Sequence, residues 1–138
     1  MSHFTSVRTE IRDMEALKKA LEAMNLRLEH NIPCRYYEGA PYRENVVRLP
    51  GPYDMALEMQ ANGAYNISAD LYRGHVEKTI GRRGCNLMKE YSIQKLRIEA
   101  QKLGYKVYSN GENNYKVVKP GEEGKLNVQF NEAGTASF

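Results

Sequence analysis

The chain of 138 residues contains no tryptophan, only two cysteines and no long apolar run. A membrane-spanning helix needs about 20 consecutive apolar residues, and the polar opening MSHFTSVRTE lacks the apolar centre of a signal peptide. We therefore expect a soluble, cytoplasmic protein with no membrane association. Cys34 and Cys85 are far apart, and neither has a Cys or His neighbour at metal-ligand spacing. Free thiols are expected at both positions.

Familiar catalytic motifs are missing as well. The sequence has no phosphate-binding loop, no nucleophile elbow and no His-Glu-x-x-His helix, and the stretch from Gly81 to Gly84 is too short to cradle a phosphate. These absences argue against the common hydrolases and nucleotide-dependent enzymes. We predict no cofactor, no metal site and no catalytic residue. The alternative is a small enzyme that uses His75 or His3 with a nearby Glu, since His transfers protons near neutral pH.

The clearest positive signal is a β-hairpin between Met55 and Tyr72. Apolar residues alternate with small or polar ones on both sides of Asn62-Gly63, and this dipeptide supplies the two positive-φ positions of a tight turn. A period of two is typical of strands with one buried face. The sequence therefore predicts two paired antiparallel strands at the centre of the fold.

Similar patterns predict the other elements. Asp13 is placed to cap a helix that ends near Asn25, and Gly104 is placed to end a second helix over residues 86–103 in a left-handed conformation. The remaining strands are expected at residues 3–11, 27–32, 35–37, 44–49, 105–108, 115–118 and 125–130, the last as an edge strand.

The order of these elements favours an α+β fold, with a mainly antiparallel sheet and two helices packed on one face. Consecutive strands bounded by helices are typical of that class rather than of a parallel, doubly wound sheet. The length fits one domain. We predict a single domain over residues 1–130 and a flexible tail over residues 131–138, which contains nothing that would order it alone.

Positive charge is concentrated in the third quarter of the chain. Residues 73–106 hold nine Lys or Arg against three Glu, although the whole chain carries only +3. Such a field attracts phosphate backbones or acidic protein surfaces. The predicted partner-binding or phosphate-binding residues are Arg73, Lys78, Arg82, Arg83, Lys89, Lys95 and Arg97.

Three interpretations of this charge stay open. The basic helix and the Arg82-Arg83 turn could dock on an acidic protein partner, because adjacent guanidinium groups bind carboxylates and phosphates in a bidentate way. The same face could bind nucleic acid, helped by stacking from some of the ten tyrosines. The plain alternative is that the cations form a solvated helix face and the tyrosines a half-buried sheet surface.

Several segments together resemble one known group of proteins. They are the opening Met1-Ser-His-Phe4, the helix with Leu17-x-x-Ala20-Leu21, the Leu49-Pro-Gly-Pro-Tyr-Asp54 turn, the Ala69-Asp70 strand end and the helix from Tyr91 to Gly104. Over roughly residues 1–120 the chain is similar to the small proteins of the hypothetical chloroplast reading frame 35 family.

The resemblance implies a context rather than a chemistry. The family occurs in plastids, cyanobacteria, other bacteria and some phages, and brings no catalytic residues to carry over. Its members are often encoded near an ATPase of the AAA class, which implies an accessory or adaptor role. A phage-encoded member would work in the host cytoplasm. We therefore expect a non-enzymatic interaction protein with a protein partner, and nucleic-acid binding as the alternative.

Overall fold

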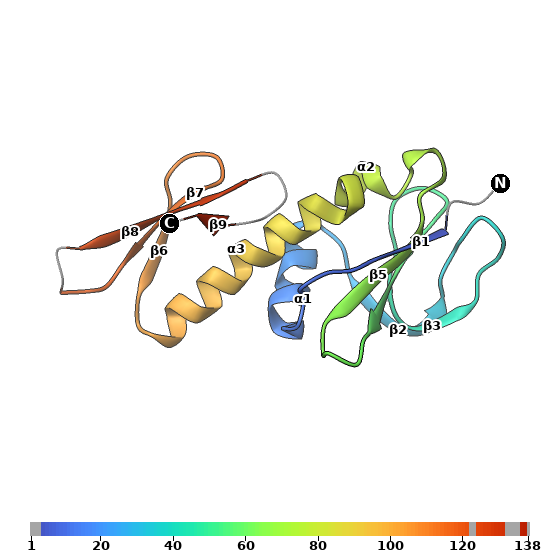
Figure 1. Ribbon diagram of the computed structural model, residues 1–138, viewed down its shortest axis with the longest axis horizontal. Helices are drawn as coiled ribbons and strands as arrows, with labels where there is room; N and C mark the ends of the chain where they lie inside the picture. The colour runs from blue at the N-terminus through green and yellow to red at the C-terminus, as the bar shows by residue number, and fades with distance from the viewer. Residues whose placement is uncertain (1–3, 122–123, 132–135, 138) are drawn as a thin grey trace.

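A computed structural model describes residues 4–121, 124–131 and 136–137. Over these residues the protein consists of two antiparallel sheets joined by one long helix, α3 (Figure 1). The predicted α+β class with antiparallel strands is confirmed. Within the described part of the chain, no helix is both long and apolar enough to cross a bilayer.

The first sheet has five strands in the order β1-β5-β4-β3-β2. They are β1 (Phe4–Val7), β2 (Leu28–Pro33), β3 (Tyr42–Val47), β4 (Met55–Met59) and β5 (Tyr65–Asp70). The predicted hairpin forms β4 and β5, in which Leu57 pairs with Ile67. Because side chains alternate along a strand, one side of both strands reaches the same core, with the residues Met55, Leu57, Tyr65, Ile67 and Ala69.

The turn of this hairpin differs from the expected two-residue turn. Met59 pairs with Tyr65, so residues 60–64 form a longer loop. In this loop Gly63 has a positive φ of 85°, whereas Asn62 does not. The Asn62 side chain instead accepts a hydrogen bond from the backbone N–H of Ala64 at 2.9 Å. That local bond gives Asn62 a role in the loop without a left-handed backbone.

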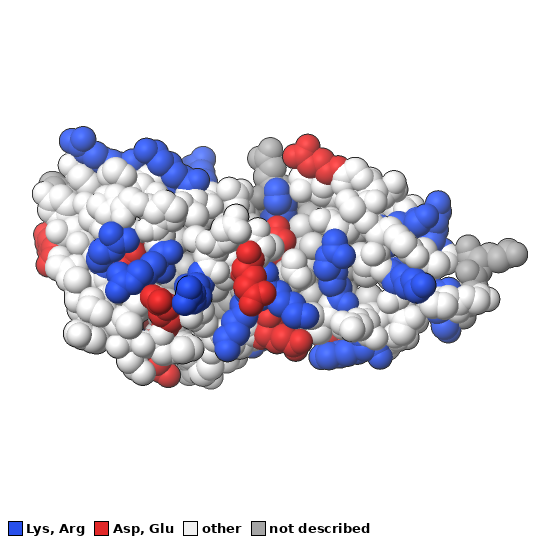
Figure 2. All heavy atoms as spheres, turned by 180° about the vertical axis from the view of Figure 1, so that it is seen from behind, with Lys and Arg blue, Asp and Glu red and all other residues white. Residues whose placement is uncertain are grey.

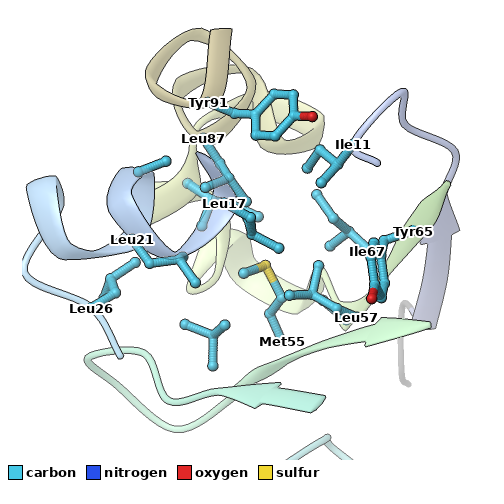
Figure 3. Close-up of a cluster of buried hydrophobic side chains, with 14 of the residues drawn as sticks. Ile11, Leu17, Leu21, Leu26, Met55, Leu57, Tyr65, Ile67, Leu87 and Tyr91 are labelled. Atoms are coloured by element: carbon cyan, nitrogen blue, oxygen red, sulfur yellow. The ribbon is translucent and has the colours of Figure 1, made fainter. Parts of the chain in front are cut away.

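Helix α1 (Met14–Ala23) covers one face of the first sheet. Asp13 caps it as predicted, because its carboxylate accepts a hydrogen bond from the N–H of Ala16 at 3.2 Å. Leu17 and Leu21 are fully buried and point toward the sheet residues Met55 and Leu57 (Figure 3). Burial of each such side chain stabilises the fold by about 1.5–3 kcal/mol.

Helix α3 (Cys85–Lys102) carries two apolar stripes. Leu87, Tyr91 and Ile98 pack into the core of the first sheet, whereas Ile93 and Ala100 pack into a second cluster. That cluster is formed with the second sheet, β6-β7-β8-β9. Its strands are β6 (Lys106–Ser109), β7 (Asn114–Val118), β8 (Lys125–Phe130) and β9 (Ala136–Ser137).

The second sheet is the main difference from the sequence-based expectation of one sheet. The predicted hairpin forms β6 and β7, but it pairs with β8 and not with the first sheet. Strand β8 is not an edge, because β9 pairs with it through Ala136 and Ser137. The rest of the predicted tail, residues 132–135 and 138, lies outside the described residues. The domain boundary at residue 130 stays a prediction.

One expected strand, residues 35–37, is a loop in the structure. Tyr36 forms only an isolated bridge to Gly39, and the loop is held instead by a buried carboxylate. Asp54 has no exposed surface and accepts hydrogen bonds from Arg35 Nη2 at 2.7 Å and from Arg35 Nε at 2.9 Å. It also accepts the backbone N–H groups of Arg35 and Leu49. The Asp54 carboxylate therefore accepts backbone hydrogen bonds that a neighbouring strand would accept in a sheet.

Candidate functional site

Four of the predicted site residues lie on residues 72–84, which we call the basic segment. It runs through the turn η1 (Tyr72–Gly74), the short helix α2 (Glu77–Ile80) and the turn η2 (Arg82–Gly84), directly before α3. Its exposed cationic residues are Arg73, Lys78, Arg82 and Arg83.

The backbone of the basic segment is anchored from below. Val76 and Ile80 are buried in the core of the first sheet, where they pack with Leu87 of α3. Between these anchors and α3, Gly81 has φ 84° and ψ 169°, a conformation open essentially to glycine alone. A Cβ atom at Gly81 would lie 2.7 Å from the backbone nitrogen of Asn86. The chain can therefore pass closely over the first turn of α3 only because this residue has no side chain.

Local contacts fix the arginines on this backbone. Arg73 and Arg83 adopt left-handed conformations with φ 54° and 52°, which are uncommon for residues other than glycine. The N–H of Arg83 donates to Glu77 Oε2 at 2.7 Å, and Arg73 Nε donates to the hydroxyl of Tyr72 at 3.1 Å. The positions from which the guanidinium groups project are thus set before any partner binds.

The positive charge of the basic segment is not neutralised by ion pairs with acidic side chains of the described residues. Among the described residues, none of Arg73, Lys78, Arg82 and Arg83 takes part in an ion pair. The segment also precedes the N-terminus of α3, whose first turn carries no acidic residue and no side-chain cap. The positive end of a helix dipole adds to the attraction for anions there.

The other three predicted site residues, Lys89, Lys95 and Arg97, do not form one continuous basic face with this segment. Lys95 and Arg97 are two residues apart, so they project from nearly opposite sides of a helix with about 3.6 residues per turn. Arg97 lies over the ring of Tyr115, 5.5 Å from its centroid, whereas Lys89 is half-buried. Figure 2 shows Lys and Arg side chains spread over both halves of one face of the molecule, with acidic groups among them.

Lys95 has a structural partner. Its Nζ lies 2.9 Å from Asp13 Oδ2 and 3.2 Å from Glu99 Oε1. The hydrogen bond that Lys95 donates to Asp13 raises the pKa of Lys95 and lowers the pKa of Asp13. The nearby hydroxyl of Tyr91 accepts the backbone N–H groups of Arg12 and Asp13. Together these contacts connect the start of α1 to the middle of α3, so Lys95 is committed to the fold.

The two histidines among the described residues, His30 and His75, each contact another side chain. His75 lies edge-on to the ring of Tyr53, with the centroids 5.6 Å apart, and His30 Nδ1 lies 3.0 Å from Asn45 Oδ1. His3 falls outside the described residues. No cluster of three or more His, Cys, Asp or Glu side chains suited to a metal occurs in the part of the chain that is described. Cys34 and Cys85 are free thiols.

Sequence reasoning missed a second positively charged surface. Lys106, Lys116 and Lys125 come from the neighbouring strands β6, β7 and β8, and they share one side of the second sheet. Polar residues at alternate positions were the available signal in each strand. It could not be used without knowing that β8 pairs with β7, because that pairing brings the three lysines together.

Comparisons with models of protein families, with curated proteins and with solved structures found no match. The resemblance to the chloroplast reading frame 35 family therefore stays a prediction. The function must be argued from the surfaces just described.

Proposed function

We propose that this protein is a non-enzymatic accessory protein that docks the basic segment on an acidic surface of a protein partner. The observation that carries the proposal is the set of four exposed cations on an anchored backbone, without an ion pair among the described residues. A charge already paired inside the molecule would have to exchange partners on binding. Cations without an internal ion pair meet a carboxylate surface without breaking one.

The chemistry of the segment suits carboxylates. Arg82 and Arg83 are adjacent, and each guanidinium group offers several N–H donors in a plane that matches two carboxylate oxygens. The resemblance noted in the sequence adds the narrower expectation that the partner is an ATPase of the AAA class. Lys95 and Arg97 are left out of the proposed interface, because Lys95 is paired with Asp13 and both residues lie more than two turns into α3, away from the basic segment.

The test compares partner capture by matched charge variants. The full chain is immobilised, and an extract of the cells that make it is passed over at low salt and again at physiological salt. We expect a specific protein, with an acidic surface, to be retained by the wild type and lost by the double variant Arg82→Gln/Arg83→Gln. With the purified partner, the variant should bind about 2- to 30-fold more weakly, since each exposed ion pair contributes about 0.2–1 kcal/mol.

The matched control is Lys18→Gln/Lys19→Gln, which removes the same charge from exposed positions on α1. Retention of the same protein by the control supports the basic segment as the interface. Equal loss in both double variants would mean that only net charge matters, and would refute the proposal. A duplex DNA probe that depends on Arg82 and Arg83, with no protein partner retained, would replace it with the nucleic-acid alternative.

A further inference from the structure

The second sheet leaves one face without any element packed on it among the described residues. Val107, Val117 and Val128 point toward α3 and the second cluster, so the residues between them in each strand point the other way. We call this opposite side the outer sheet face. Its members are Lys106, Tyr108, Asn114, Lys116, Val118, Lys125, Asn127 and Gln129.

The outer sheet face is cationic and carries one exposed aromatic ring. Lys106, Lys116 and Lys125 stand on three neighbouring strands, and none of the described residues on this face is acidic. Lys116 Nζ lies 5.8 Å from the ring centroid of Tyr108, and Tyr108 remains 48% exposed. Figure 2 shows Lys and Arg side chains spread over the end of the molecule that carries this sheet. Such a surface suits a polyanion that also carries planar aromatic groups able to stack on a tyrosine ring.

A hollow with amide side chains lies on the same face. Its volume is about 390 Å³, and its lining includes Asn110, Asn114, Asn127, Gln129 and Lys125. Sites for small organic groups begin at about 300 Å³. The side chains of Asn127 and Gln129 are exposed and form no hydrogen bond with other described residues. Amides offer both donors and acceptors, so this hollow can read the edge of a base or a sugar hydroxyl.

We propose that the outer sheet face binds single-stranded RNA. The lysines would neutralise phosphates, Tyr108 would stack on a base, and the amide hollow would hold a neighbouring nucleotide. Bases are free to stack on a protein ring only when they are unpaired. The 2′-hydroxyl of RNA is both donor and acceptor, which suits the amides and gives RNA the advantage over DNA.

The shape of the face argues against a duplex. Four strands about 4.8 Å apart span about 14 Å before side chains are added, whereas the major groove of B-DNA is about 12 Å wide. An acidic protein surface could use the same lysines, and a polyglutamate probe tests that occupant directly. This inference goes beyond the docking function proposed above, and it uses none of the residues of the basic segment.

The experiment measures fluorescence anisotropy of a labelled single-stranded RNA of about 12 nucleotides, a length within the usual range of binding sites. We expect binding by the full chain, with affinity falling about 20-fold between 50 and 200 mM salt if three phosphates are neutralised. Tyr108→Ala should weaken binding by about five-fold or more, the value of one stacked base. Lys116→Gln should weaken binding and also reduce the salt dependence by about one phosphate contact.

Matched controls separate this site from general charge. Tyr42→Ala removes a tyrosine that is 72% exposed on the first sheet, and Lys18→Gln removes a lysine from α1; both should bind RNA like the wild type. Circular dichroism checks that Tyr108→Ala and Lys116→Gln remain folded. Arg82→Gln/Arg83→Gln should also retain RNA binding, so this inference and the docking proposal succeed or fail separately.

The inference would be overturned by no binding at low salt, by equal losses in the control variants, or by equal or tighter binding of duplex RNA or of polyglutamate. Tighter binding of single-stranded DNA of the same sequence would also contradict it, because the argument from the 2′-hydroxyl would then be wrong.

Discussion

The buried carboxylate of Asp54 offers the sharpest test of what holds the first sheet together. Replacing it with alanine removes a bidentate partner of Arg35, a longer ion pair with Arg48 at 3.6 Å, and the acceptor of two backbone N–H groups, those of Arg35 and Leu49. Asp54 is 0% exposed, whereas the Arg35 side chain is 39% exposed. Water can therefore rehydrate the freed guanidinium group, but it reaches the two backbone donors less easily.

The expected loss follows from this asymmetry. A buried donor left without an acceptor costs about 1–3 kcal/mol, and the partly exposed arginine adds little after solvent screening. Asp54→Ala should thus lower the free energy of unfolding by about 3 kcal/mol, which corresponds to roughly 10 °C in the melting temperature of a domain of this size. Urea denaturation followed by circular dichroism measures the first quantity, and a thermal scan measures the second.

The control is Glu10→Ala. Glu10 forms an ion pair with Arg12 at 3.4 Å, and both side chains are well exposed, so the change should cost less than about 1 kcal/mol. If Asp54→Ala lowers the free energy of unfolding no more than Glu10→Ala does, the carboxylate of Asp54 does not anchor the loop.

Three further outcomes are expected. Burial raises the pKa of Asp54, but the hydrogen bonds from Arg35 outweigh burial and lower the pKa of this carboxyl in the folded state. The stability that the Asp54 carboxylate contributes should be fully present above its pKa in the unfolded chain, about 3.9. That stability should be lost as the pH falls through the lower pKa of the folded state. Asp54→Asn should therefore show a flatter acid limb in a plot of unfolding free energy against pH. Gly81→Ala should lower the free energy of unfolding by about 1–3 kcal/mol through backbone strain, and further through the contact of the new Cβ atom with α3. Its control is Gly63→Ala, which has a similar φ of 85° but open space around it and should cost clearly less in the same urea assay. Equal costs would contradict the close approach of the chain to α3. Tyr91→Phe should lower the free energy of unfolding by about 1–3 kcal/mol, because it leaves two backbone N–H groups before α1 without an acceptor. Tyr65→Phe, at a ring that is just as buried, should cost little, and thermal denaturation measures both variants. A similar loss of stability in both would show that the hydroxyl of Tyr91 does not contribute.

Local patterns were sufficient to predict the elements whose signals lie within a few residues. Alternation on both sides of Asn62-Gly63 predicted β4 and β5, and the Asp13 cap predicted the start of α1. The end of α3 was also predictable, because Gly104 has the expected positive φ of 76°. In each case the conformation is determined by residues within the element or directly next to it.

The division into two sheets could not be predicted in the same way. An alternating strand such as β7 pairs equally well with either sheet as far as its own sequence tells. The choice depends on α3, where Ile93 and Ala100 leave a second apolar stripe beside the one formed by Tyr91 and Ile98. Both stripes occur in the sequence, but only the folded helix shows that they face different neighbours.

The candidate site shows the same limit. Arg82 and Arg83 are adjacent in the sequence, so their proximity was predictable. Lys95 was predicted to bind a partner, yet the structure gives it Asp13, 82 residues away, as an ion-pair partner. Charge counted along a chain therefore overestimates the charge that is available on the surface.

Helix α3 also fixes a distance. It has 18 residues with no glycine or proline inside it, so at about 1.5 Å per residue it holds its two ends about 27 Å apart. The basic segment adjoins one end and the second sheet adjoins the other. If the two proposed surfaces both bind their partners, this helix sets the spacing between them, and that spacing should stay constant whether one surface or both are occupied.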